Sequence, residues 1–240
     1  MSRIANRRGA ACFFVASVLL LCAAARSAPN YKEILLSSDR PEDEKALDAV
    51  RKPDEVLAFY GVKRGDKVAD LFAAQGYYTA ILSHLVGKDG VVYSASQPIR
   101  PELRERAKQP GMANVRLIDG PFYRLALPQD GSLDFVLIHL DYHEGKPEVR
   151  VAMNRRVFGA LKHGGVYGVV DHSAKAGEAE AVAKKLHRID KNLVIQEVTG
   201  VGFRLEKEGE MLRRPDDTRD FSTIKIRNKS DRFVLKFVKP

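Results

Sequence analysis

Short apolar runs alternate with segments of helical periodicity over most of the chain. The runs typical of strands are residues 67–72, 91–96, 115–119, 133–139 and 166–171. The segments with apolar residues at helical spacing are residues 77–86, 101–108, 147–161 and 178–189. Strands that alternate with helices in this way predict an α/β fold, in which a mostly parallel, twisted sheet has helices on both faces.

The regions that flank this alternation have other patterns. Residues 42–52 and 54–60 have helical patterns, and residues 29–40 before them are typical of an extended arm. Near the other end, residues 194–201 and 233–238 are apolar runs with no helix predicted between them. We therefore expect these two runs to form an antiparallel pair of strands at one edge of the sheet. The charged connection at residues 206–220 is predicted to be a solvated loop or a flap over the site.

The first 28 residues have the features of a secretory signal peptide. Three arginines precede an apolar run at residues 10–25, and small residues follow it. The run is short for a membrane-spanning helix, although an uncleaved anchor is the alternative. We expect a signal peptide at residues 1–28, one domain at residues 29–240, and an exported protein that is periplasmic or extracellular and not inserted in a membrane after processing.

Composition adds two exclusions. Both cysteines, Cys12 and Cys22, lie in the leader, so the mature chain has no disulfide and no thiol for catalysis or zinc binding. The net charge is +9, but the basic residues are dispersed and are not gathered into a patch with aromatic side chains. This pattern argues against nucleic acid as a partner.

A strand–turn–helix–strand unit at residues 66–96 is the centre of the predicted site. Its first strand reaches Asp70, small residues form a turn at residues 73–76, and the helix begins at Tyr77. So short a crossover predicts a parallel pair of strands. Parallel sheets bind ligands at the carboxyl ends of their strands, facing helix N-termini, so we expect a ligand at this turn.

A series of motifs extends from residue 40 to the end of the chain. They are Arg51-Lys52-Pro53, Asp70 with Gly76-Tyr77-Tyr78-Thr79, Tyr142-His143, Leu161-Lys162-His163-Gly164-Gly165, Asp171-His172-Ser173-Ala174, His187-Arg188-Ile189-Asp190 and the final ten residues. With these motifs the chain resembles class I S-adenosylmethionine-dependent methyltransferases, and more closely a group of exported bacterial predicted methyltransferases. The resemblance implies a Rossmann-like methyltransferase domain with S-adenosylmethionine as cofactor. The methyl acceptor would be a small molecule or another, unknown compound.

The resemblance also implies which residues bind the cofactor. The matching positions are Asp70, Ala74, Gly76, Tyr77 and Asp119. Asp70 would hold the amino-acid end, and Asp119 would lie beside the adenine amino group, although an Asp-Gly turn explains Asp119 equally well.

Two departures from the family pattern weaken this assignment. Where the family has the run Gly-x-Gly-x-Gly, this chain has Phe72, Ala74 and Gly76. The second strand ends at residues 94–97 without the carboxylate that usually holds the ribose hydroxyls.

Polar side chains follow the fourth and fifth predicted strands. His143 follows the fourth strand, and Asp171 and His172 follow the fifth. Because the carboxyl ends of neighbouring parallel strands meet at one edge, we expect these three catalytic candidates to share a pocket that faces Asp70 and Gly76.

The chemistry of this cluster has three interpretations. His143 could act as a general base, since imidazole titrates near neutral pH, and activity would then fall below about pH 6.5. Alternatively, His139, Asp141 and His143 could bind a metal, because alternate residues of an extended segment share a face. The third interpretation is a loop with one hydrogen-bonded histidine. His187, on a predicted helix, could reach this cluster or form a salt bridge.

The leading hypothesis is an exported enzyme that transfers a methyl group from S-adenosylmethionine. This reaction needs alignment of the reactants and sometimes a base, and it needs no protein nucleophile. The alternatives are a degenerate, non-catalytic binding protein with the same fold, or a metal-assisted enzyme that uses the His/Asp cluster.

Overall fold

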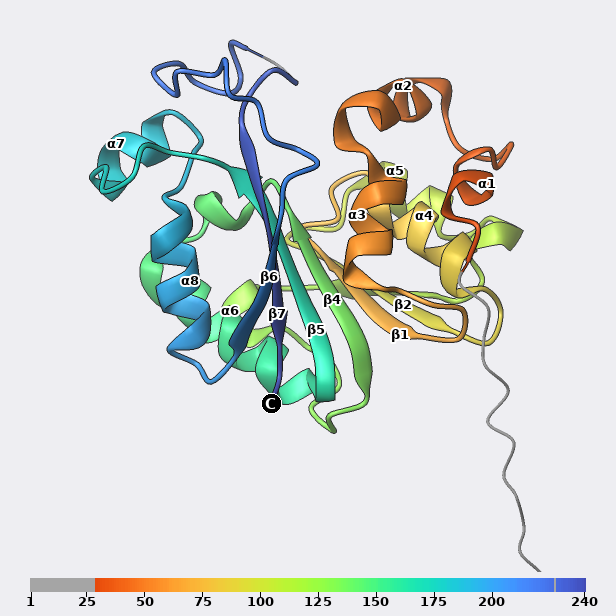
Figure 1. Cartoon of the computed structure of the whole chain (residues 1–240). Coiled ribbons are helices and arrows are strands. Elements are labelled where there is room, and N and C mark those ends of the chain that lie inside the picture. The colour runs from red at the N-terminus through yellow and green to blue at the C-terminus, as the bar shows by residue number, and fades with distance from the viewer. Residues whose placement is uncertain (1–28, 227) are drawn as a thin grey trace, which may run out of the picture.

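A seven-stranded sheet forms the centre of the protein, and helices cover both of its faces (Figure 1). The computed structural model describes residues 29–226 and 228–240. The signal peptide predicted at residues 1–28 therefore lies outside the described residues. Among the described residues, no helix is long and apolar enough to cross a membrane.

The strands lie across the sheet in the order β3-β2-β1-β4-β5-β7-β6. They are β1 (Lys67–Leu71), β2 (Val91–Ser96), β3 (Val115–Asp119), β4 (Leu133–His139), β5 (Leu161–His172), β6 (Arg204–Gly209) and β7 (Arg232–Val238). Strands β1 to β5 pair in parallel, whereas β7 runs antiparallel to both β5 and β6. The predicted α/β fold, with a mostly parallel sheet and an antiparallel pair at one edge, is confirmed.

Proline and glycine set the ends of several helices. The α-helices are α1 (Tyr31–Leu35), α2 (Glu42–Arg51), α3 (Pro53–Tyr60), α4 (Tyr77–Val86), α5 (Pro101–Arg106), α6 (Pro147–Ala160), α7 (Glu180–Lys185) and α8 (Lys191–Thr199). Three short 3-10 helices are η1 (Pro110–Met112), η2 (Phe122–Arg124) and η3 (Tyr142–Glu144). Proline is the first residue of α3, α5 and α6, where the missing N–H costs no helical hydrogen bond.

The two faces of the sheet are buried by different helices. On β4, Phe135 and Leu137 pack in a core with α3 and α4, while Val136 and Ile138 pack in a second core with α6 and α8. This alternation follows from the two-residue period of a strand. Because both faces are covered, ligands can approach only from the ends and edges of the strands.

One predicted strand is a helix in the structure. Residues 194–201 were expected to form a strand because β-branched residues dominate there, but α8 covers most of this segment. The Asp190 side chain accepts a hydrogen bond from the Asn192 N–H and caps the helix. Val194 and Val198, one helical turn apart, are both fully buried. Capping and burial on one face therefore outweigh strand propensity, and β6 takes the place of the expected strand beside β7.

Other predicted boundaries also differ. The arm at residues 29–40 contains α1, and the connection predicted at residues 206–220 begins within β6. Strand β5 starts at Leu161, earlier than expected. Helix α7 covers only Glu180–Lys185 of the helix predicted at residues 178–189, because the backbone turns to a left-handed conformation at His187.

A buried charged network fixes α2 against α4 above the sheet. The Arg40 guanidinium donates to both carboxylate oxygens of Asp48, at 2.8 and 2.7 Å. The Tyr77 hydroxyl donates to the same carboxylate at 2.6 Å. Because the Arg40 side chain is completely buried, Asp48 is the group that neutralises it. This network positions Arg51, at the end of α2, over the Tyr77 ring.

We predict that Asp48→Ala lowers the free energy of unfolding by about 3 kcal/mol, because it leaves the Arg40 charge buried and unpaired. Urea denaturation would measure this loss. The matched control is Glu42→Ala, which removes a surface partner of Lys45 and should cost less than about 1 kcal/mol. Equal losses in the two variants would contradict the proposed role of the network.

Candidate functional site

The first candidate residue, Asp70, is fixed at the end of β1 by helix α4. Its Oδ2 accepts a hydrogen bond from the Thr79 hydroxyl at 2.6 Å, and Thr79 Oγ1 lies 2.8 Å from Ser94 Oγ on β2. Burial raises the pKa of Asp70 to about 7, although the hydrogen bond from Thr79 opposes the shift. The carboxyl is therefore partly protonated near neutral pH.

The turn between β1 and α4 keeps a left-handed backbone at three alternate residues. The φ angles are +57° at Phe72, +49° at Ala74 and +92° at Gly76. These are the positions at which the family that the chain resembles has glycine. A non-glycine residue in this region costs about 1–2 kcal/mol. The Ala74 N–H donates to Ser96 Oγ at 3.2 Å, and this bond anchors the turn to the end of β2.

Gly76 lies at the start of α4 and is enclosed by α5. A Cβ atom on Gly76 would lie 2.8 Å from Leu103 Cδ1, which is too close without movement of that side chain. The positive φ and the nearby Leu103 side chain both favour glycine at this position. Gly76 does not line either of the two cavities described below. Its predicted contact with a cofactor stays a prediction.

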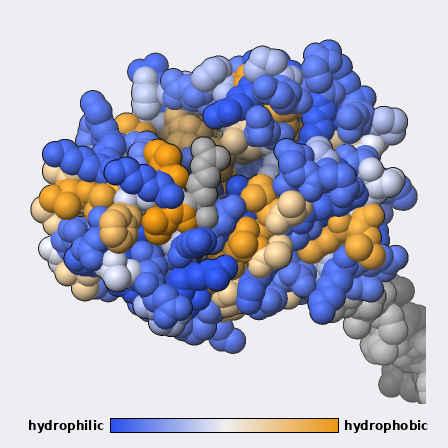
Figure 2. Space-filling model, turned by 90° about the horizontal axis from the view of Figure 1, so that it is seen from above, coloured by the Kyte–Doolittle hydropathy of each residue, from blue (hydrophilic) through white to orange (hydrophobic). Residues whose placement is uncertain are grey.

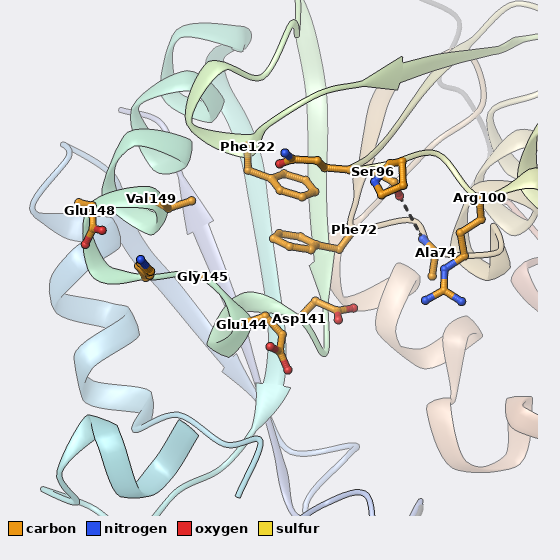
Figure 3. Close-up of a pocket in the computed structure, with 13 residues that line it drawn as sticks. Phe72, Ala74, Ser96, Arg100, Phe122, Asp141, Glu144, Gly145, Glu148 and Val149 are labelled. Atoms are coloured by element: carbon orange, nitrogen blue, oxygen red, sulfur yellow. Dashed lines mark hydrogen bonds between the residues drawn. The ribbon is translucent and has the colours of Figure 1, made fainter. Parts of the chain in front are cut away.

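Two cavities adjoin at this turn. The larger has a volume of about 540 Å³ and the smaller of about 170 Å³. Phe72, Ala74 and Asp141 line both. In the larger cavity the rings of Phe72 and Phe122 are stacked, with centroids 3.6 Å apart, and the carboxylates of Asp141 and Glu144 lie below them in Figure 3.

The smaller cavity contains buried polar atoms that lack partners. The Tyr78 hydroxyl, His139 Nε2 and Arg51 Nε are buried and have no hydrogen-bond partner among the described residues, and all three residues line this cavity. Burial lowers the pKa of His139 well below its ordinary value, so the ring is neutral. Buried polar groups are usually paired, so this cluster indicates a site for a polar ligand.

Asp119 is the predicted site residue that the structure separates from the others. Its carboxylate is half-exposed and forms an ion pair with Arg104 of α5, and it lines neither cavity. The end of β2 does contribute to the candidate site, because Ser96 and Gln97 line the larger cavity. The predicted role of Asp119 beside a cofactor stays a prediction.

Asp171 joins the ends of β4 and β5. Its carboxylate accepts hydrogen bonds from the His143 backbone N–H at 2.8 Å and from the His172 N–H at 2.7 Å. His143 Nδ1 lies 2.9 Å from Asp171 Oδ1. The predicted convergence of the three catalytic candidates is thus observed, but none of them lines either cavity. Instead, Asp141 and Glu144, next to and within η3, line the larger cavity.

These cavities lie at the carboxyl ends of the parallel strands, the upper end in Figure 1. Figure 2 shows this end from above: hydrophilic side chains dominate, and apolar side chains are scattered among them.

No family model matches the chain. A protein-L-isoaspartate O-methyltransferase from Ignicoccus hospitalis is 38% identical over 63 residues, which cover 25% of this chain and 29% of the relative. Among solved structures, a SAM-dependent methyltransferase from Aquifex aeolicus superimposes with a TM-score of 0.59 at 19% identity, covering 84% of this chain and 99% of that chain. The cyclase SpnF superimposes with a TM-score of 0.62 at 14% identity, covering 80% of this chain and 81% of that chain.

The chain has the class I methyltransferase fold. The strand order, the antiparallel β7 and the superpositions agree on this point. Identities this low define the fold alone. The site residues must therefore be judged by their own chemistry.

Within this methyltransferase fold, His143 does not have the protonation state that the sequence analysis assumed. Burial is the largest single influence and favours a lower pKa for His143, but the carboxylates of Asp171, Glu144 and Asp141 together outweigh it and raise the pKa to about 9. Burial favours a higher pKa for Asp171, but the His143 charge and the hydrogen bonds from His143 and the His172 N–H together outweigh it, so the pKa is lowered. His143 is therefore protonated at neutral pH, which does not suit a general base there. The loss of activity expected from a His143 base stays a prediction.

The structure identifies two residues for which the sequence had indicated no role in cofactor binding or proton transfer. Asp141 lines both cavities, and burial together with the nearby Asp171 charge raises its pKa to about 7. Arg51 reaches the smaller cavity from the end of α2. The sequence signal for Arg51 was the motif Arg51-Lys52-Pro53, which is one of the motifs that carry the family resemblance. Asp141 had been considered only as a metal ligand.

We predict that the His143 ring titrates with a midpoint near pH 9 and that Asp171→Asn lowers this midpoint. The stabilisation from the charged pair is complete below about pH 6.5 and is lost as the pH rises through about 9. NMR titration of the labelled imidazoles would measure it. His172 is the internal control, because burial holds its pKa at about 3 and its signals should stay constant near neutral pH. A wild-type midpoint at or below 6.5 for His143 would contradict the charged pair.

Proposed function

We propose that the protein is an exported S-adenosylmethionine-dependent methyltransferase that acts on an unidentified acceptor. The observation that carries the proposal is the left-handed backbone at Phe72 and Ala74. Residues other than glycine are strained in this backbone conformation, and such strain is concentrated at functional sites. The turn keeps the backbone path that glycine would provide, at the carboxyl end of β1, where this fold binds ligands.

The residues around the two cavities suit the parts of this cofactor. The larger cavity, of about 540 Å³, is within the usual range for small-molecule sites. Phe72 and Phe122 are stacked on each other, so a planar base would lie against the outer face or the edges of the pair, and Ser96 can hydrogen-bond a ribose hydroxyl. In the smaller cavity, the Arg51 guanidinium suits a carboxylate and Asp70 suits an ammonium group. When bound, the cofactor supplies an electrophilic methyl group.

Asp141 is the residue we assign to proton transfer in this reaction. It lines both cavities, and its pKa of about 7 lets it accept a proton from an acceptor near neutral pH. His143 and Asp171 hold the segment that contains it, so we assign them to positioning. His172 is neutral and bonds to Ser230 at 2.7 Å, which suits a structural role.

A second candidate function is a binding protein, or an enzyme for another reaction, with the same fold. The lack of a carboxylate at the end of β2 favours this candidate, because a carboxylate at that position usually holds the ribose hydroxyls. A cyclase with this fold shows that the fold does not fix the reaction.

We predict that the mature protein binds both S-adenosylmethionine and its demethylated product. Calorimetry with the wild type and two variants at one position tests this. Ala74→Leu should abolish binding, because the larger side chain enters both cavities while the backbone already tolerates a Cβ there. Ala74→Gly should retain binding and relieve strain. Absence of wild-type binding at millimolar ligand would contradict the proposal, and so would equal binding by the leucine variant.

Export is proposed from the sequence of residues 1–28. We predict that the processed protein begins near residues 27–30 and is recovered outside the cytoplasm. N-terminal sequencing of protein produced in a secreting bacterial host measures this. A chain that still begins at Met1 or Ser2 would contradict it.

A further inference from the structure

Three metal-ligating side chains converge beside the larger cavity. His143 and Glu144 belong to η3, and His187 follows the end of α7. His143 Nε2 lies 3.0 Å from Glu144 Oε1, and His187 Nδ1 lies 2.8 Å from the same oxygen. One ligand atom from each residue lies within 4.8 Å of the others. We propose that His143, Glu144 and His187 bind a divalent transition-metal ion, and this inference does not depend on the proposed methyltransferase function.

The backbone around His187 holds its ring toward Glu144. His187 has a φ of +53°, which a non-glycine residue adopts only when its surroundings enforce it. Next to it, the Arg188 side chain is fully buried and bonds to the Asp217 carboxylate at 2.9 Å. On the other side, the Lys184 ammonium donates to the Glu144 backbone carbonyl at 3.3 Å. The Lys184 contact joins the end of α7 to η3, and the Arg188–Asp217 pair anchors the turn that follows α7.

Asp171 orients His143 as a metal ligand is usually oriented. The Asp171 carboxylate binds the Nδ1 side of the ring, at 2.9 Å, so Nε2 is the nitrogen that faces Glu144. Histidine ligands commonly donate their second ring N–H to a carboxylate, which fixes the tautomer and strengthens the metal bond. Binding of a metal would replace the Nε2 proton, while the Nδ1 proton would stay on the His143 ring and donate to the Asp171 carboxylate.

The set of ligand atoms restricts the kind of metal. Two imidazole nitrogens and one carboxylate oxygen suit Zn²⁺, Co²⁺ or Fe²⁺, whereas Mg²⁺ and Ca²⁺ prefer oxygen ligands. Tetrahedral Zn²⁺ with bonds of about 2.0–2.1 Å needs ligand atoms about 3.3 Å apart. The two observed hydrogen-bonded distances are slightly shorter, so a small outward rotation of the side chains accommodates an ion.

The proposed site is partly exposed and adjoins the larger cavity through Glu144. The side chains of Glu144 and His187 are 43% and 35% exposed, and Glu144 also lines that cavity. Three protein ligands with a free position are typical of catalytic metal sites, where water or a substrate completes the coordination. This set differs from the His139, Asp141 and His143 set considered from the sequence, because His139 lies in the wall of the smaller cavity.

Cobalt binding tests the proposal directly. Untagged mature protein, freed of metal by a chelator, is titrated with Co²⁺ in the absence of S-adenosylmethionine and followed by visible absorption and calorimetry. We expect one Co²⁺ per chain with the absorption of a four- or five-coordinate ion, and displacement by Zn²⁺. His187→Ala and Glu144→Gln should weaken binding at least tenfold, and Asp171→Asn by about 10–100-fold.

The matched control is His163→Ala, which removes an exposed histidine near the opposite end of β5 and should leave the Co²⁺ affinity unchanged. Circular dichroism confirms that each variant is folded. Two results would overturn the site: no Co²⁺ absorption band in the wild type, or the same Co²⁺ affinity in His187→Ala as in the wild type. Because no cofactor is added, either failure is distinct from failure of the methyltransferase proposal.

Discussion

The buried carboxylate of Asp171 is the interaction on which the candidate site depends. It is completely buried, and it accepts hydrogen bonds from the backbone of His143 and His172 and pairs with the His143 ring. A buried charge of this kind persists only when it is paired and hydrogen-bonded. The pairing ties η3 to the end of β5. Asp141 and Glu144 therefore face the larger cavity, and the free side of His143 faces Glu144.

The turn between β1 and α4 shows that a backbone path can persist after its usual residues are lost. Phe72 and Ala74 adopt the conformation that glycine adopts freely, at a cost of about 1–2 kcal/mol each. The Phe72 ring regains part of this energy by stacking on Phe122. Under the proposed function, a ligand that needs this turn would explain why the strained conformation is kept. The altered glycine run therefore argues less strongly against cofactor binding than the sequence suggested.

The sequence predicts most of the fold, because glycine and proline punctuate it. The bounds of α4, β2, β3 and β4 agree with the predicted segments, whereas α8 was mistaken for a strand because its burial on one face depends on contacts with α6 and the sheet. The pairing of His143 with Asp171 follows from the adjacency of β4 and β5. The contact between His187 and Glu144 and the stacking of Phe72 on Phe122 were not predictable, because they depend on where separate loops place their side chains.

The most direct test of the central claim is a crystal structure of the mature protein with S-adenosylhomocysteine, the demethylated cofactor. The account predicts ligand density across both cavities, with the nucleoside beside Phe72 and Phe122, the amino-acid end beside Asp70 and Arg51, and the left-handed backbone at Ala74 unchanged. Density at another place on the protein, or empty cavities in crystals grown at saturating ligand, would contradict it.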